Sequence, residues 1–233
     1  MSVNIYWACL NKQWMRAKEP ESVLNIFYSK DIADKNNQNL SLNYCPSFNN
    51  SLNNVYAIRS LYDYEFKIEN SSVTTNLYNQ EFFDDHVLIR SIEKKFFTFY
   101  NQYVFFTEEE TLDMYTYQYP FFEENNITER CIIIPGKFDI GKWFRPLEFP
   151  FILKNNFNEF KVENDEILYY IKFDTNKKIK FTQFKYTEKI DSLIMDDTQM
   201  SSGLKPRLKP ISWWYENFKL KNHVLKEIKN NIL

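Results

Sequence analysis

The chain has 233 residues, 18% of them aromatic, and its 29 lysines and arginines nearly balance 31 aspartates and glutamates, for a net charge of −2. So many rings can fill a large core without disulfides or metals. The interleaved charges show no basic stripe of the kind typical of proteins that bind duplex nucleic acid, so we expect no such partner, while local basic patches made by folding stay open. With three glycines, the chain has no glycine-rich phosphate loop, which excludes the common nucleotide-binding motifs.

The first half of the chain predicts strands. Residues 4–10 are apolar on both faces, which predicts a buried strand held in a sheet. Residues 20–30 fit a short helix and an extended segment equally well, so both alternatives stay open. Alternation of aromatic and charged residues predicts one half-exposed strand over residues 55–68. Residues 87–106 are rich in aromatic and β-branched side chains and favour further strands.

The middle of the chain is broken by prolines. Residues 131–134 predict a fully buried strand that ends at the turn pair Pro135 and Gly136. Residues 135–150 hold three prolines and two of the three glycines, so we expect a structured loop or short edge pieces there.

A hairpin and a helix are predicted toward the C-terminus. Residues 167–173 and 179–184 alternate in polarity around a short polar stretch, which predicts an antiparallel hairpin. The last 22 residues change to helical spacing, with Ser212 as the expected N-cap. We expect this helix to dock through four apolar residues: Trp214, Phe218, Leu225 and Ile228.

Together these patterns predict a single domain over residues 1–233, with a β-rich body over 1–186, a connection over 187–211 and a C-terminal helix over 212–233. The predicted fold class is mainly β, an antiparallel β-sandwich or jelly-roll-like domain with a C-terminal amphipathic helix, and an α+β arrangement stays open. The N-terminus has no secretory pattern and no 18-residue apolar run occurs, so we expect a cytoplasmic protein without a membrane partner.

Metal and cofactor chemistry has little support. Cys9, Cys45 and Cys131 are scattered and are expected to be free, buried thiols. His86 and His223 are too few and too far apart for a cupin or iron-oxygenase site. The sequence therefore predicts no metal and no cofactor.

Two groups of residues are candidates for a functional site. Acidic runs at residues 84–85, 108–110, 123–124 and 196–197 could supply the two carboxylates of a glycosidase, although each run is also typical of a solvated turn. The proline-held segment offers a ligand-binding site made of Asp139, Trp143, Arg145 and Glu148, in which Trp143 supplies a flat face and Arg145 planar donors. In the alternative, Trp143 is buried and Arg145 pairs with a neighbouring carboxylate.

Five short motifs carry a resemblance: the Cys45–Pro46 turn, the run at 54–60, the Ile134–Pro135 turn, the apolar–proline piece at 149–152 and the alternating segment at 166–184. In this order they resemble uncharacterised proteins of about this length from marine tailed phages and, more distantly, bacterial β-rich domains of unknown function. The resemblance spans residues 5–186. It implies an origin and a fold, and no activity.

Three functions stay open. We favour a non-enzymatic binding or virion-associated β-domain whose partner is a protein, a small molecule or a glycan. A cofactor-independent hydrolase with a carboxylate pair comes second, and a metal-dependent jelly-roll oxygenase is disfavoured by the two histidines. The expected location is the host cytoplasm or the virion, and an oligomer stays open.

Overall fold

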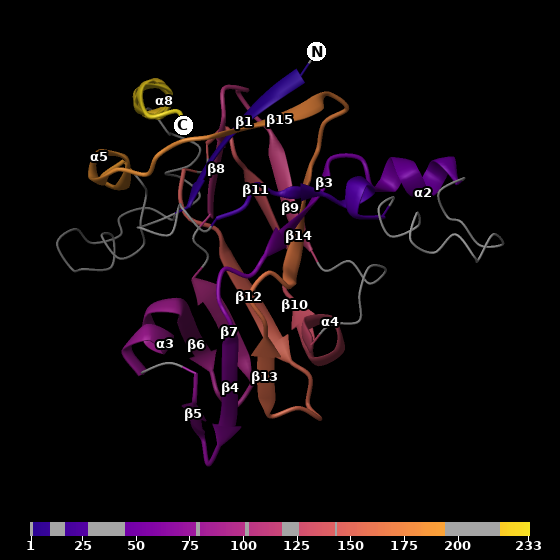
Figure 1. Ribbon diagram of the computed structural model, residues 1–233, viewed down its shortest axis with the longest axis vertical. Coiled ribbons are helices and arrows are strands. Elements are labelled where there is room, and N and C mark those ends of the chain that lie inside the picture. Colours follow the sequence, from indigo (N-terminus) through magenta and orange to yellow (C-terminus); the bar gives the residue numbers. More distant parts are fainter. Residues whose placement is uncertain are drawn as a thin grey trace, which may run out of the picture.

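The computed structural model describes residues 2–9, 17–27, 45–77, 80–100, 103–117, 126–142, 144–193 and 220–233. Their strands form four sheets, two toward each end of the molecule (Figure 1). At the upper end lie the β1 sheet, ordered β15 (Lys178–Gln183), β1 (Ser2–Cys9), β8 (Tyr103–Thr107), and the β14 sheet, ordered β11 (Gly136–Asp139), β9 (Asp113–Tyr117), β14 (Ile167–Phe173), β3 (Val55–Arg59), β2 (Glu21–Ser22). At the lower end lie the β7 sheet, ordered β10 (Cys131–Ile133), β12 (Glu148–Leu153), β7 (Phe96–Tyr100), β6 (Val87–Ser91), and the β4 sheet, ordered β13 (Glu159–Val162), β4 (Tyr64–Glu69), β5 (Ser72–Thr74).

One aromatic core joins all four sheets. It includes Trp7 of the β1 sheet, Phe173 of the β14 sheet, Phe97 of the β7 sheet and Phe66 of the β4 sheet. Rings pack against one another through much of it, as Phe149 does on Tyr169 with centroids 4.4 Å apart. The predicted mainly β class, with antiparallel sheets and a C-terminal helix, is confirmed, and sheets packed around a shared core are consistent with the predicted sandwich.

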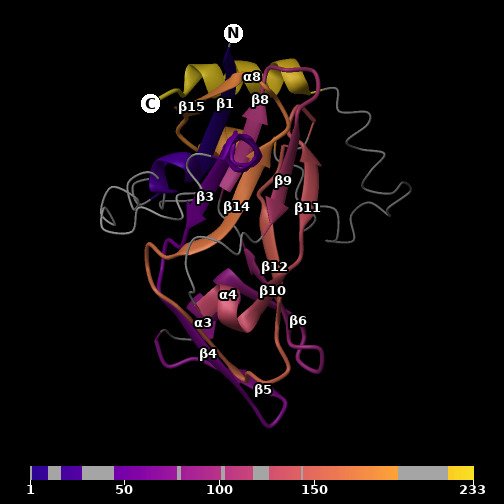
Figure 2. The same ribbon diagram turned by 90° about the vertical axis from the view of Figure 1, so that its right-hand side faces the viewer.

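The N-terminal strand is buried on both faces, as predicted. Ile5 and Trp7 face the main core, whereas Tyr6 and Ala8 face a second cluster on the other side of the β1 sheet. Helices α5 (Glu188–Asp191) and α8 (Lys221–Asn230) cover that second cluster. Figure 2 shows α8 lying across β1, β8 and β15.

The predicted hairpin is wrong, although both of its strands form. β14 pairs with β3 and β9, while β15 leaves for the β1 sheet and pairs in parallel with β1. The side chain of Asn54 holds the crossing, since its Nδ2 donates to the carbonyl oxygens of Thr175 at 2.6 Å and Lys177 at 3.1 Å. β14 is buried on both faces and has a strand on each side, so it has no free edge left for β15.

Residues 55–68 form two strands rather than the one predicted. β3 and β4 belong to different sheets, and the chain bends between them at residues 60–63. The turn between their partner strands, β13 and β14, lies beside this bend. Ser60 N donates to Glu166 O at 2.8 Å, and Asp165 N donates to Ser60 O at 2.9 Å. Asp165 adopts a left-handed backbone with φ 72°, typical of such turns.

The proline-rich middle contains three short strands: β10 and β12 lie in the β7 sheet, and β11 between them in the chain lies in the β14 sheet. β10 is an edge strand buried on one face only, since Ile132 is 53% exposed, so the prediction of a fully buried strand is wrong. Pro150 lies inside β12, where its carbonyl accepts from Ile134 N at 3.0 Å. Proline has no backbone N–H, and at position 150 that group would have pointed toward the chain just beyond the end of β10. The ladder between β10 and β12 therefore lacks one hydrogen bond at its end.

The body also contains the short helices α2 (Pro46–Ser51), α3 (Gln80–His86) and α4 (Asn126–Arg130) and a turn of helix over residues 23–27. Both alternatives for residues 20–30 are met in part, since residues 21–22 form the strand β2 and residues 23–27 are helical, with Val23 and Ile26 buried against the outer face of the β14 sheet. Residues 28–30 lie outside the described residues.

The C-terminal helix α8 begins at Lys221 with Leu220 at its N-cap position, so Ser212 is not its cap. Ile228 is buried and Leu225 packs against the same cluster, as predicted. Trp214 and Phe218 lie outside the described residues.

Candidate functional site

Asp139 is occupied by its own turn. It ends β11, and its Oδ1 accepts from the backbone N–H groups of Leu112 and Gly141, both at 3.0 Å. Its Oδ2 lies 3.3 Å from Lys142 Nζ. These contacts hold the turn after β11 against residue 112.

Arg145 and Glu148 are brought together by the structure. Arg145 is 8% exposed, and one of its terminal nitrogens lies 3.2 Å from Glu148 Oε1. The other carboxylate oxygen, Glu148 Oε2, lies 2.7 Å from a terminal nitrogen of Arg90. This pairing favours the structural alternative for Arg145. Trp143, the fourth residue of the predicted site, lies outside the described residues.

Of the described acidic runs, the one at 84–85 lies on α3, where Asp84 Oδ1 accepts from Gln80 Nε2 at 2.7 Å, and the one at 108–110 connects different elements. Glu108 accepts from the Tyr6 hydroxyl at 2.5 Å and lies 2.9 Å from Lys229 Nζ, and these two contacts hold its pKa below the ordinary value. Glu109 lies 3.0 Å from Lys177 Nζ. The runs at 123–124 and 196–197 lie outside the described residues.

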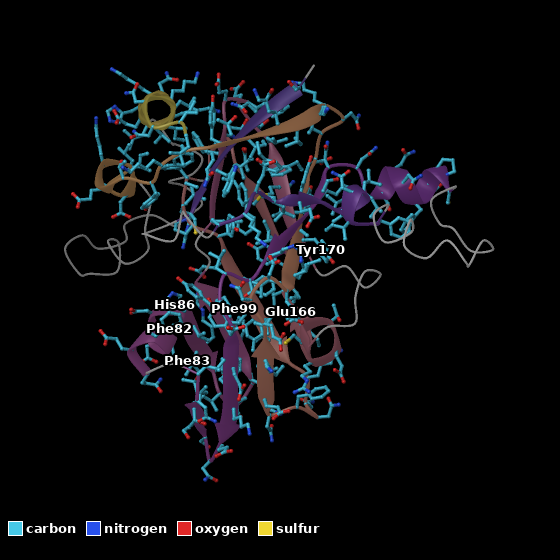
Figure 3. All side chains as sticks on the ribbon, in the orientation of Figure 1. Phe82, Phe83, His86, Phe99, Glu166 and Tyr170 are labelled. Atoms are coloured by element: carbon cyan, nitrogen blue, oxygen red, sulfur yellow. The ribbon has the colours of Figure 1, made fainter. Side chains whose placement is uncertain are left out.

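His86 is part of an aromatic stack. Its ring lies on that of Phe82, with centroids 4.0 Å apart, and against the edge of Tyr62 at 5.1 Å. Figure 3 shows His86, Phe82 and Phe83 together on α3. The side chain therefore packs α3 rather than pointing into a cleft.

Two of the three cysteines are buried, as expected. They are Cys9 and Cys131, whereas Cys45 is exposed, which corrects the expectation for that residue. Burial raises the pKa of the Cys131 thiol to about 12, so that thiol is inert near neutral pH. Within the residues that the structure describes, no three metal-ligating side chains come together.

A cavity of about 570 Å³ lies where the β14 sheet meets the β1 sheet. Three segments line it: residues 18–25, the strand β3 and the strand β15, which contribute Lys18, Glu19, Pro20, Glu21, Ser22, Asn25, Tyr56, Ala57, Arg59, Ile179, Lys180 and Phe181. It exists because β15 leaves β14 to join β1, which places the edge of one sheet beside the edge of another.

The floor of the cavity is aromatic. The ring of Tyr56 meets Phe181 edge to face, with centroids 4.8 Å apart, and touches Phe173 at 5.9 Å. Burial, with the nearby charge of Glu19, raises the pKa of Tyr56 to about 12, so its hydroxyl is a donor at neutral pH. That hydroxyl forms no hydrogen bond with the described residues.

The rim holds paired and unpaired charges. Arg59 donates to Glu21 Oε2 from two nitrogens, at 2.8 and 3.2 Å, and Lys18 lies 2.8 Å from Asp165. Glu19 and Lys180 form no ion pair or hydrogen bond within the described part of the chain. Burial raises the pKa of Glu19 above its ordinary value. Within the described residues, the cavity therefore offers one carboxyl without a partner, that of Glu19, above an apolar floor, while the side chain of Lys180 projects from the face of β15 opposite Ile179 and Phe181.

No sequence pattern indicates this site. Its lining comes from three separate segments, at residues 18–25, 56–59 and 179–181, and residues 18–22 form no recognisable motif. The alternation of β15 was visible, but its parallel pairing with β1, which creates the cavity, was not.

Comparison of the chain with protein-family models, curated proteins and solved structures gave no match. None of the helices in the described ranges is long and apolar enough to cross a membrane. The cavity is therefore the feature from which we infer a function.

Proposed function

We propose that the chain is a non-enzymatic binding domain whose ligand occupies the cavity between β3 and β15. The observation that supports this proposal is the combination of an aromatic floor with uncommitted polar groups, the Tyr56 hydroxyl and the Glu19 carboxyl. Concave, partly apolar sites with a few converging polar groups are where proteins bind ligands. The ligand is a protein segment, a small molecule or a glycan.

The resemblance to tailed-phage proteins adds that this ligand belongs to an infected cell or to a virion. We expect no chemical conversion of it, because the charged groups of the rim are mostly committed to one another.

A screen of a glycan array, a fragment mixture and a short-peptide library tests the proposal. We expect at least one class to bind wild-type protein, and Tyr56→Phe to weaken that binding about 3- to 10-fold through loss of one hydrogen bond. Glu19→Gln should weaken it as well. Glu69→Gln, which changes an exposed carboxyl at the end of β4, is the matched control and should bind like wild type. Binding that neither cavity variant alters would overturn the proposal.

A second candidate function is favoured by one observation: two carboxylates, Glu19 and Glu21, line the same cavity. Their surroundings differ, since Arg59 binds Glu21 whereas burial raises the pKa of Glu19. Glycosidases need this division of one carboxylic acid and one carboxylate. Release of nitrophenol from aryl glycosides by wild type, and its loss in Glu19→Gln, would replace the binding proposal with a hydrolase.

A further inference from the structure

The strand β15 has one edge on β1, its other edge is paired with no strand of the described ranges, and its residues Ile179 and Phe181 line the cavity. Phe184 N donates inward to Trp7 O of β1 at 3.0 Å. On the other side, Gln183 O accepts from Leu233 N at 3.1 Å, and Lys185 N donates to Asn231 O at 2.8 Å. Because backbone groups alternate direction along a strand, the N–H and C=O groups of Ile179 and Phe181 also face outward.

Among the described residues, the outer edge of β15 is occupied at one end only. Residues 231–233 run antiparallel to β15 there, with Phe184 opposite Ile232. The outward backbone groups of Ile179 and Phe181 have no hydrogen-bond partner among the described residues, and both residues line the cavity. An open edge beside a cavity provides a ladder for a strand and a place for its side chains.

We propose that an extended peptide binds to β15 as an added antiparallel strand, in line with residues 231–233. This inference depends on the proposed binding function and names its ligand. Hydrogen bonds to Ile179 and Phe181 supply the ladder. Peptide residues opposite these two project over the cavity, beside Tyr56.

Charge defines which peptide fits. A lysine or arginine opposite Phe181 or Ile179 lays its aliphatic stem on the aromatic floor and brings its cation to Glu19. The next peptide residue points to the other face of the strand, beside Lys180, which is exposed and has no ion pair within the described residues. An aspartate or glutamate there forms a cross-strand pair. The expected ligand is thus an extended segment with a basic residue followed or preceded by an acidic one.

A second copy of the chain fits this edge poorly. Pairing β15 with itself through Ile179 sets Lys180 opposite either Lys180 or Lys178 of the other copy. Like charges directly opposite each other destabilise a strand pair, and edge lysines are a common protection against such pairing.

The test uses a blocked, fluorescent hexapeptide of threonine and valine with a central lysine–aspartate step. Two N-methylated versions isolate the backbone contribution, because methylation at lysine removes a hydrogen facing β15, whereas methylation at aspartate removes one facing solvent. We expect N-methyl-lysine to weaken binding to the full chain at least 10-fold and N-methyl-aspartate to leave it unchanged. Amide exchange at Ile179 and Phe181 should slow in the complex.

Equal effects of the two methylations, or exchange at Ile179 and Phe181 that stays unchanged, would overturn strand addition. Concentration-dependent dimerisation that slows exchange at these amides without peptide would also overturn it, in favour of a second copy. If glycans or fragments bind in a Tyr56-dependent way and the hexapeptide does not, the peptide inference fails and the proposed binding function stands. If no probe binds, both fail.

Discussion

Gly141 lies where two backbone segments touch. A Cβ placed there would be 2.7 Å from the carbonyl oxygens of both Glu109 and Glu110. Backbone cannot rotate away as a side chain can, and the turn that holds Gly141 is tied down by Asp139. We expect Gly141→Ala to lower the free energy of unfolding by about 1–3 kcal/mol, measured by urea denaturation.

Gly136 provides the matched control. A Cβ there would meet the ring of Phe138, also at 2.7 Å, but this ring is the end of a half-buried side chain and can move. Gly136→Ala should therefore cost less. Equal losses for both variants would show that the approach of the two backbones at Gly141 has no special effect.

At the scale of elements, α8 is held by two fully buried apolar residues, Val224 and Ile228. Ile228 has no exposed surface, whereas Ile232, four positions on, is 47% exposed. Truncating a buried isoleucine to alanine leaves a cavity and costs about 2–5 kcal/mol. We expect a loss of this size for Ile228→Ala and a much smaller one for Ile232→Ala, compared by thermal melting. Similar losses would mean that α8 does not dock as described.

The contact of α8 with the β1 sheet should depend on pH. Tyr6 and Lys229 bind the Glu108 carboxylate and lower its pKa from the ordinary 4.5. A carboxyl with a lowered pKa in the folded state stabilises the fold above pH 4.5, and this contribution is lost as the pH falls through the lower, folded value. We expect Glu108→Gln to melt below wild type at about pH 7, with the gap closing as the pH falls below 4.5.

The exposed Glu69 supplies the comparison for that titration. Its substitution by glutamine should leave the melting temperature close to that of wild type across the same range. A gap between wild type and Glu108→Gln that persisted in acid would contradict a role for the carboxylate charge.

Most strands were predictable because each carries its own pattern. Apolar residues on both faces identified β1, and alternation identified β14 and β15. Pairing was not predictable, since hydrogen bonds of the backbone do not depend on the side chains that form the pattern. The hairpin failed for this reason: the short polar stretch at residues 174–177 suits a tight turn, but here Asn54 binds it as a crossing between two sheets.

The site was less predictable than the strands. The pairing of Arg145 with Glu148 agrees with the structural alternative that the sequence left open, and the additional contact of Glu148 with Arg90, 58 residues away in the chain, had no sequence signal. Glu19 gained its raised pKa from burial at a junction of distant segments. Burial of this kind comes from tertiary packing, which a single sequence does not display.

At the scale of the whole molecule, the shared aromatic core predicts cooperative unfolding. Trp7 near one end and Phe160 near the other belong to the same cluster of buried side chains. We expect one calorimetric transition whose calorimetric and van't Hoff enthalpies agree, as for a single two-state domain. Two resolved transitions would contradict the predicted single domain over residues 1–233.

The parallel pairing of β1 with β15 also affects synthesis of the chain. Ser2 is opposite Lys178, so β1 leaves the ribosome 176 residues before its parallel partner. At about 5–20 residues per second, translation takes roughly 10–35 seconds to reach that partner. During this interval β1, a strand whose native position buries both of its faces, has no parallel neighbour. Nascent chains thus carry an apolar N-terminal segment that a ribosome-associated chaperone can bind until β15 emerges.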